Sequence, residues 1–271
     1  MLTATASDGT EVHARDMGRG TPVVLVLHPG MDDGTSWEKV GTHLSRRFRV
    51  VIPHRPRYRP DLSPGVPVTT EVDHVCALIH AIDAPILLVG HSSGAVVALE
   101  TLVTLPSSFV GAVLYDPPIV TAEHPLGMPT SWRRKSSVAR ARAAVAQGRM
   151  RRAFAIHARE ILKLPRGLAA LAALLAGSHP RWRSLIPAQI EDAAAIEELG
   201  DRLSRYAEIA IPTVLLSGRR QQGDLHARLS SLQQVMPDAH HVLLPGQSHS
   251  AHRKAPTAVA DVIERLADRV A

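Results

Sequence analysis

The stretch LLVGHSSGAVVALE, residues 87–100, places a serine between two glycines. An apolar run typical of a buried strand precedes the Gly-His-Ser-Ser-Gly motif at 90–94, and a helical pattern follows it. A serine hydroxyl is a poor nucleophile unless it is exposed and has a base beside it. Because the two glycines permit a sharp strand-to-helix turn, we interpret Ser92 as a nucleophile. A serine that only caps the helix is the alternative.

Short apolar runs bounded by glycine or proline recur along the chain, and helical patterns alternate with them. Each run is too short for a helix and suits a strand that is buried on both faces of a parallel sheet. The runs are 23–27, 50–52, 86–89, 110–115, 213–216 and 241–244, and the helical segments are 36–46, 70–82, 93–105, 224–235 and 256–270. This alternation predicts a doubly wound α/β sheet, preceded by a hairpin in the first 25 residues.

The interval 121–210 interrupts the alternation. It is rich in Ala, Leu, Arg and Glu, has helical periodicity and contains no convincing strand. We expect it to be divided into several helices at Pro165, Gly167, Gly177, Pro180, Pro187 and Gly200. At the carboxyl ends of parallel strands such an insertion would cover a ligand pocket. We therefore predict a core domain of residues 1–120 and 211–271 and a helical lid of residues 121–210, with scaffold far from any site as the alternative.

Composition restricts the class of protein further. With 271 residues and 45% hydrophobic content, the chain is large enough to bury one α/β core. A single cysteine excludes an intramolecular disulfide and a multi-cysteine metal site, which fits a reducing cytosol. Residues 1–16 do not resemble a signal peptide, and no apolar stretch approaches the roughly 20 residues that span a bilayer. We expect a soluble, cytoplasmic protein with no membrane partner.

The net charge of +6 comes mainly from arginines between residues 133 and 152. A basic patch can attract nucleic acid or an acidic substrate. These arginines, however, are interleaved with alanines at helical spacing, and the chain has only three Trp, three Tyr and three Phe residues for base stacking. We interpret the arginines as a solvated helix face and expect no nucleic-acid partner.

A catalytic base for Ser92 is expected late in the chain. His249 lies in LLPGQSHSAHRKAP, after the last apolar run and before the final helix. This position matches the chain order serine, acid, histidine that is known for serine hydrolases on parallel sheets. His252, three residues further on, is the second candidate.

Several motifs together resemble the α/β-hydrolase superfamily over nearly the whole chain. After the opening hairpin they are, in order, LVLHPGMDDGTSW, VGHSSGAVVALE, LYDPP, IPTVLLSG and LPGQSHSAH. The chain is similar in particular to bacterial serine hydrolases with a tyrosine, an acidic residue and two prolines after the sixth strand. The resemblance implies a mostly parallel sheet with a helical cap inserted after the sixth strand. It leaves the substrate open.

The resemblance also implies an oxyanion hole made of two backbone N–H groups. One belongs to the residue after the nucleophile, here Ser93, and the other to the loop after the third strand, His-Pro-Gly-Met at 28–31. Proline has no N–H, so Pro29 cannot donate. Gly30 is the expected donor, and Met31 is the alternative.

The acid of the implied triad has two candidates. Many family members place it after the seventh strand, but in LLSGRRQQGD the aspartate, Asp224, comes late and directly before a helical pattern, so helix capping explains it. Other members place it at the end of the sixth strand, where VLYDPP has Asp116. Because a carboxylate there can reach a histidine loop, we favour Asp116. That Asp116 only caps its own loop is the alternative.

These residues predict a serine hydrolase of esterase type that acts on an ester, thioester or related acyl substrate through an acyl-enzyme. Neither a metal-binding motif nor a Gly-rich phosphate loop occurs in the sequence, so we expect no cofactor. The scarcity of aromatic residues favours an apolar small-molecule substrate. The sequence leaves open the identity of this substrate and the oligomeric state of the protein. Since a fold does not fix a reaction, acyl transfer, elimination or cyclisation in a biosynthetic pathway is one alternative and a non-catalytic small-molecule binder is another.

Overall fold

The computed structural model describes residues 1–126, 136–220 and 224–270. Within them the sheet has eight strands in the order β1-β2-β4-β3-β5-β6-β7-β8. The strands are β1 (Leu2–Thr5), β2 (Glu11–Met17), β3 (Val23–Leu27), β4 (Val50–Pro53), β5 (Ile86–His91), β6 (Phe109–Tyr115), β7 (Thr213–Gly218) and β8 (Ala239–Leu244). β2 is antiparallel to β1 and to β4, and all other neighbours are parallel. The predicted hairpin and the mostly parallel sheet are confirmed.

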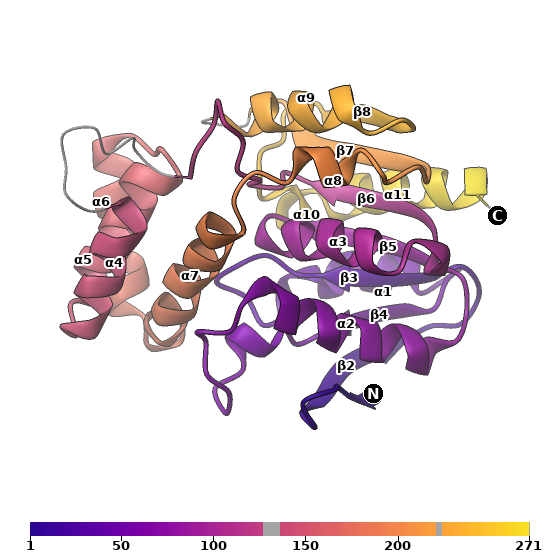
Figure 1. The fold of residues 1–271 in the computed structure, drawn as a ribbon, viewed down its shortest axis with the longest axis horizontal. Coiled ribbons are helices and arrows are strands. Elements are labelled where there is room, and N and C mark those ends of the chain that lie inside the picture. The colour runs from indigo at the N-terminus through magenta and orange to yellow at the C-terminus, as the bar shows by residue number, and fades with distance from the viewer. Residues whose placement is uncertain (127–135, 221–223, 271) are drawn as a thin grey trace.

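The central strands are apolar throughout because helices cover both faces of the sheet (Figure 1). Every residue of β3 and of β5 is buried, so neither strand has a solvent face. One apolar cluster packs under α2 (Val68–Ile82), α3 (Ser93–Thr104) and α9 (Leu225–Val235), and a second packs under α1 (Glu38–Leu44) and α11 (Pro256–Val270). The sheet is therefore doubly wound, as predicted.

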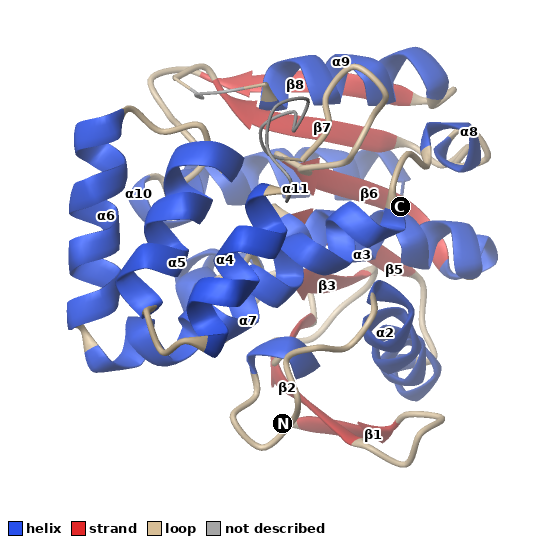
Figure 2. Cartoon of the chain, turned by 60° about the vertical axis from the view of Figure 1, so that its left-hand side comes forward, coloured by secondary structure: helices blue, strands red, loops and turns tan. Residues whose placement is uncertain are grey.

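A helical insertion connects β6 to β7. Its elements are α4 (Ser137–Ala146), α5 (Met150–Ile156), a π-helical turn (His157–Ile161), α6 (Arg166–Ser178), α7 (Pro180–Leu199) and α8 (Leu203–Tyr206). Figure 2 shows α4 to α7 packed side by side beyond one end of the sheet. None of the helices in the described ranges is long and apolar enough to cross a membrane.

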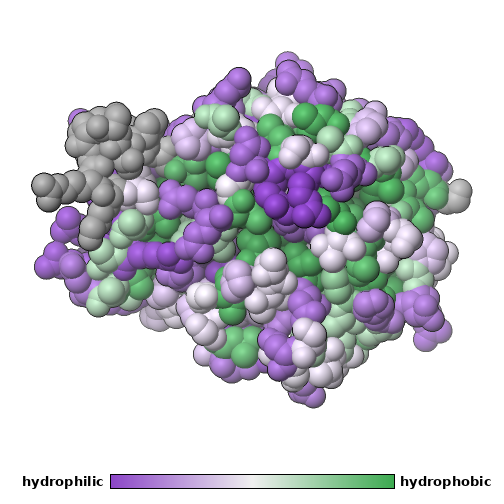
Figure 3. Space-filling view, in the orientation of Figure 1, coloured by the Kyte–Doolittle hydropathy of each residue, from purple (hydrophilic) through white to green (hydrophobic). Residues whose placement is uncertain are grey.

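Two arginines of the predicted basic stretch are paired with acidic residues of the insertion. Arg140 pairs with Glu160, and Arg142 pairs with Glu191 and Glu198. Residues 133–135, the first part of the predicted basic stretch, lie outside the described ranges. In Figure 3 hydrophilic and apolar residues are interspersed over the face shown.

Pro187 lies inside α7, which corrects the prediction that it divides the insertion. Gly167 and Gly177 are the second and the penultimate residue of α6, so they lie at its two ends, as predicted. Pro187 removes one backbone donor from α7, but the helix continues because its neighbours Ile186 and Ala188 are buried. Gly177 also permits close packing of α6 on α5, since a Cβ there would lie 2.2 Å from Cγ of Arg151.

Asp192 anchors α7 to the core through a buried network of charges. Its carboxylate accepts hydrogen bonds from Arg55 at 3.1 Å and from the hydroxyl of Tyr58 at 2.6 Å. Glu71 of α2 accepts from Arg55 at 2.7 Å and from Arg57 at 2.9 Å. Burial alone would raise the pKa of Asp192, but the two guanidinium groups hold it below its ordinary value. The opposite charges thus compensate one another where an unpaired charge would be costly.

Removal of Asp192 should destabilise the protein far more than removal of an exposed carboxylate on the same helix. Asp192→Ala leaves Arg55 and Tyr58 buried without this partner, which should lower the free energy of unfolding by about 3–5 kcal/mol. The matched control is Glu198→Ala, because the Glu198 side chain is 62% exposed and should contribute less than about 1 kcal/mol. Urea unfolding followed by circular dichroism measures both. Equal losses for the two variants would contradict a buried anchor at Asp192.

Candidate active site

Ser92 occupies a strained turn between β5 and α3. Its φ of 54° and ψ of −126° are uncommon for a residue with a side chain. The turn is held by a 2.8 Å hydrogen bond from the Ser92 N–H to the carbonyl of Tyr115 on β6. A Cβ at Gly94 would lie 2.4 Å from the carbonyl oxygen of Leu27, and one at Gly90 would lie 2.5 Å from a Cα of α3. The two glycines therefore let α3 begin directly against the sheet.

His249 and Asp116 are in contact. Nδ1 of His249, on the loop after β8, lies 3.0 Å from Oδ2 of Asp116, which follows β6 and is fully buried. The N–H of Asp116 donates to the carbonyl of Leu216 at 3.0 Å, which ties the acid to β7. Because an ionised carboxylate only accepts hydrogen bonds, Nδ1 carries the proton. With Nδ1 as the donor, Nε2 is left to accept a hydrogen bond.

Tyr115 braces the loop that carries His249. Its hydroxyl donates to the carbonyl of Ser248 at 2.5 Å and accepts from the N–H of Ala251 at 3.0 Å. These two groups flank His249, so the loop is fixed relative to β6. Burial raises the pKa of the Tyr115 hydroxyl, which stays protonated and able to donate. The position of Tyr115 directly before Asp116 in LYDPP is the only sequence signal for this role.

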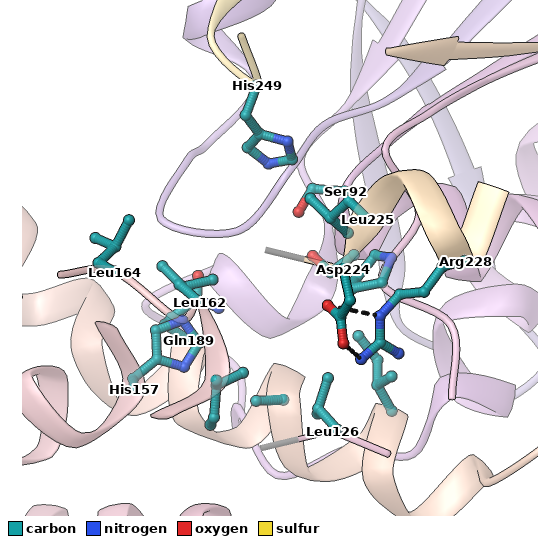
Figure 4. Close-up of a pocket in the computed structure, with 15 residues that line it drawn as sticks. Ser92, Leu126, His157, Leu162, Leu164, Gln189, Asp224, Leu225, Arg228 and His249 are labelled. Carbon is teal, nitrogen blue, oxygen red and sulfur yellow. Dashed lines mark hydrogen bonds and ion pairs between the residues drawn. The ribbon is translucent and has the colours of Figure 1, made fainter. Parts of the chain in front are cut away.

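Ser92 and His249 line the same cavity (Figure 4). The imidazole of His249 lies 4.6 Å, between ring centroids, from that of His91, the residue before Ser92. In the described residues the side chain of His249 forms a hydrogen bond with Asp116 and does not form one with Ser92. Such bonds are often long in unliganded sites and shorten when substrate binds.

His252, the second candidate for the base, has a different environment. It is 5% exposed, its Nε2 lies 3.1 Å from Oγ of Ser36, and its ring stacks on Trp37. Ser36 in turn donates to Asp32 at 2.6 Å. Burial lowers the pKa of His252 to about 4. The ring is therefore a buried neutral group that supports the loop.

Asp224, the second candidate for the acid, lies across the cavity from His249 (Figure 4). Its carboxylate pairs with Lys163 at 2.6 Å and with Arg228 at 3.0 Å. Burial would raise its pKa, but Arg228 and Lys163 hold it at about 2. Of the two candidate acids, Asp116 is the one beside His249.

The predicted oxyanion donors belong to residues that line the same cavity as Ser92. Ser93 is the first residue of α3, so its N–H has no acceptor within the helix. Gly30 and Met31 line the cavity with Ser92, whereas the carbonyl of Pro29 accepts from Nδ1 of His28 at 2.8 Å. A Cβ at Gly30 would lie 2.1 Å from Oε1 of Gln189 on α7, so a side chain there would displace Gln189.

Arg55 lies beneath both oxyanion segments. Its guanidinium donates to Oγ of Ser93 at 2.9 Å and to the carbonyl of His28 at 3.1 Å. Arg55, which lies in the loop after β4, was not singled out in the sequence. Its partners are separated from it by up to 137 residues, so no local pattern could reveal them.

The cavity has two connected parts, which we call the deep chamber and the outer chamber. The deep chamber has a volume of about 170 Å³ and a mainly apolar wall that includes Leu126, Ile161, Leu164, Ala193 and Ile196. The outer chamber is more open and more polar, with a volume of about 920 Å³. Five residues line both chambers, and they are Ser92, His157, Leu162, Gln189 and His249.

His157 and Gln189 were not singled out in the sequence, although both line the cavity. His157 begins the π-helical turn after α5, is 2% exposed and has no hydrogen-bond partner at Nδ1 among the described residues. Burial lowers its pKa to about 4. Single π-helical turns occur frequently at functional sites, but no sequence signal predicts one here.

One group of possible metal ligands occurs in the described part of the chain. Ligand atoms of His43, Asp261 and Glu264 lie within 4.8 Å of one another between α1 and α11. Arg47 also approaches Glu264, at 3.7 Å. None of these residues lines either chamber.

A mostly parallel sheet with a serine at a strained strand-to-helix turn and a histidine after the last strand defines an α/β-hydrolase fold. A model of the alpha/beta hydrolase family matches residues 23–262, and the chain belongs to this family. The resemblance seen in the sequence is confirmed, and the protein is an enzyme of the hydrolase class.

Solved structures agree with this fold over nearly the whole chain. An alpha/beta hydrolase from Sphaerobacter thermophilus is 24% identical, with a TM-score of 0.80, over 98% of this chain and 99% of that one. An esterase from Exiguobacterium antarcticum is 17% identical, with a TM-score of 0.75 over the same shares. An enol-lactonase from Burkholderia xenovorans is 17% identical, with a TM-score of 0.72, also over 98% and 99%. Comparison with curated proteins gives no match.

Three buried histidines should make the protein less stable in mild acid. Burial lowers the pKa of His28, His157 and His252 to about 4, against an ordinary value of 6.5. Below pH 6.5 the unfolded chain takes up protons that the folded chain does not. Stability is therefore complete above that pH and is lost as the pH falls toward 4, by up to about 1.4 kcal/mol per pH unit for each histidine.

Unfolding in urea between pH 6.5 and 4 measures this slope. His157→Gln should make it shallower, because one of the three groups is gone, whereas the exposed control His240→Gln should leave it unchanged. An identical slope in the wild type and in His157→Gln would show that burial of His157 does not contribute.

Proposed function

We propose that this enzyme is a serine esterase that hydrolyses an ester, thioester or related acyl substrate through an acyl-enzyme. The observation that carries the proposal is the 3.0 Å contact of Asp116 with His249 on the rim of a cavity that Ser92 also lines. The names of two similar structures, an esterase and an enol-lactonase, agree with chemistry at an ester bond.

In the proposed mechanism, Oγ of Ser92 attacks the acyl carbon while Nε2 of His249 takes up its proton. The carboxylate of Asp116 stabilises the resulting imidazolium and keeps its orientation. The N–H groups of Ser93 and Gly30 donate to the developing oxyanion, with Met31 as the alternative to Gly30. His249 then protonates the leaving group, and the acyl group stays on Ser92. Water, deprotonated by His249, releases the acid and restores the serine.

The helical insertion has the role of a lid in this proposal. Residues of the π-helical turn and of α7 form much of the deep chamber, while Ser92 and His249 come from the core. The lid therefore provides the apolar surface that would hold the acyl part of a small-molecule substrate and keep bulk water away. An apolar acyl group is the expected preference.

Substitutions at the three residues test the mechanism on a chromogenic ester such as 4-nitrophenyl hexanoate. Ser92→Ala should lower kcat about 10⁶-fold, and Asp116→Asn about 10⁴-fold, because the histidine then loses its orientation and its counter-charge. Asp224→Asn is the matched control for the acid and should lower kcat far less. An active Ser92→Ala enzyme would contradict the proposal, and a larger loss in Asp224→Asn than in Asp116→Asn would reassign the acid.

A further inference from the structure

We propose that the leaving group of the natural substrate carries an anionic group, such as a carboxylate or phosphate, which binds to Lys39, Arg253 and Lys254 in the outer chamber. The proposal rests on the esterase function and adds a substrate class to it. It follows from the different charges of the two chambers and from the way they meet at Ser92.

The outer chamber has an excess of positive charge that its own wall does not neutralise. Lys39 of α1, and Arg253 and Lys254 of α10 (Ala251–Lys254), are exposed and have no ion-pair partner among the described residues. A fourth cation of the wall, Arg181, is already paired with Asp33 at 2.9 Å. The one carboxylate of the wall, Asp32, is 7% exposed.

Asp32 forms no ion pair with these cations in the described residues, and its two oxygens are turned to Ser36. They accept from the N–H of Ser36 at 3.3 Å and from its hydroxyl at 2.6 Å. Three free cations that come from two separate helices thus face one polar chamber. Such an arrangement raises the local concentration of an anionic ligand.

The deep chamber, in contrast, fits an uncharged group. Its wall is mainly apolar, and its two charged residues, Asp224 and Arg228, are paired with each other at 3.0 Å. A volume of about 170 Å³ is comparable to that of an apolar cavity that takes up benzene, so a group of about six carbons fits. An anionic group on the acyl part of the substrate would lose its hydration in the deep chamber, with no free cation to compensate.

The order of the chemical steps assigns the two halves of the substrate to the two chambers. The acyl group stays on Ser92 until water attacks, so we assign it to the deep chamber, which is the less open of the two. The leaving group must depart first, and the outer chamber is the more open and larger part. Because Ser92 and His249 line both chambers, an ester that spans them has its scissile bond at the serine.

Three chromogenic esters separate the possible positions of the charge. They are 4-nitrophenyl hexanoate, which is neutral, 3-carboxy-4-nitrophenyl hexanoate, with the charge on the leaving group, and the mono-4-nitrophenyl ester of adipic acid, with the charge on the acyl group. The measured quantity is the ratio of kcat/KM for each anionic ester to kcat/KM for the neutral ester. Comparing enzyme variants by this ratio cancels differences in intrinsic reactivity.

In the variant with Lys39→Gln, Arg253→Gln and Lys254→Gln, the ratio for the anionic leaving group should fall about tenfold, since each exposed charge contributes a small, additive attraction. The matched control carries Arg46→Gln, Arg205→Gln and Arg265→Gln, three exposed cations outside both chambers, and should keep the wild-type ratio.

A salt titration of the wild-type enzyme gives a second measurement that needs no variant. Raising the ionic strength from 0.01 M to 1 M shortens the screening length from about 30 Å to about 3 Å, so the preference for the anionic leaving group should decline. A salt-independent ratio would overturn the proposal.

The remaining outcomes distinguish the two proposals from each other. If all three esters are left intact by the wild-type enzyme, the esterase function fails. If the neutral ester is hydrolysed but the ratio is the same in the triple variant and its control, only the anion site fails. A selective loss for the adipate ester would place the anion on the acyl side and overturn the assignment to the leaving group.

Discussion

The buried guanidinium of Arg55 holds together the segments from which the site is built. It pairs with Glu71 on α2 and with Asp192 on α7, and it donates to Ser93 and to the carbonyl of His28. A buried charge that loses one partner is strongly destabilising, so each of these segments is constrained relative to the others. The insertion, the start of α3 and the loop after β3 are thereby held by one guanidinium group. A rearrangement that moves α7 away from the core would break the contact between Arg55 and Asp192.

Unusual backbone conformations occur at the two neighbouring strand ends of the site. Ser92 after β5 and Asp116 after β6 both have a positive φ, of 54° and 47°. The Ser92 N–H bonds to the carbonyl of Tyr115, and the Asp116 N–H bonds to the carbonyl of Leu216, so each strained residue is secured by the next strand of the sheet. Strain of this kind persists only where the surroundings determine it, and it clusters at functional sites. The parallel sheet thus positions a serine and a carboxylate at one edge.

The sequence predicts those parts of the molecule that are encoded locally. The apolar runs give the strands, and the two glycines around Ser92 give the turn, because each depends on residues a few positions apart. His249 and Asp116 follow from chain order and from LYDPP, in agreement with their contact in the structure. The network of Arg55 could not be predicted, since its partners are 16 to 137 residues away. The uninterrupted α7 around Pro187 likewise depends on tertiary burial, which local propensity does not reveal.

The proposed chemistry depends on the reactivity of Ser92, which a covalent probe measures most directly. After incubation with a fluorophosphonate, mass spectrometry of the intact protein and of its peptides should show one adduct, on the peptide that contains Ser92. Labelling should slow strongly in His249→Ala, because the serine has lost its base. An unlabelled wild-type protein at every pH tested, or an adduct that persists in Ser92→Ala, would contradict a nucleophilic role for this serine.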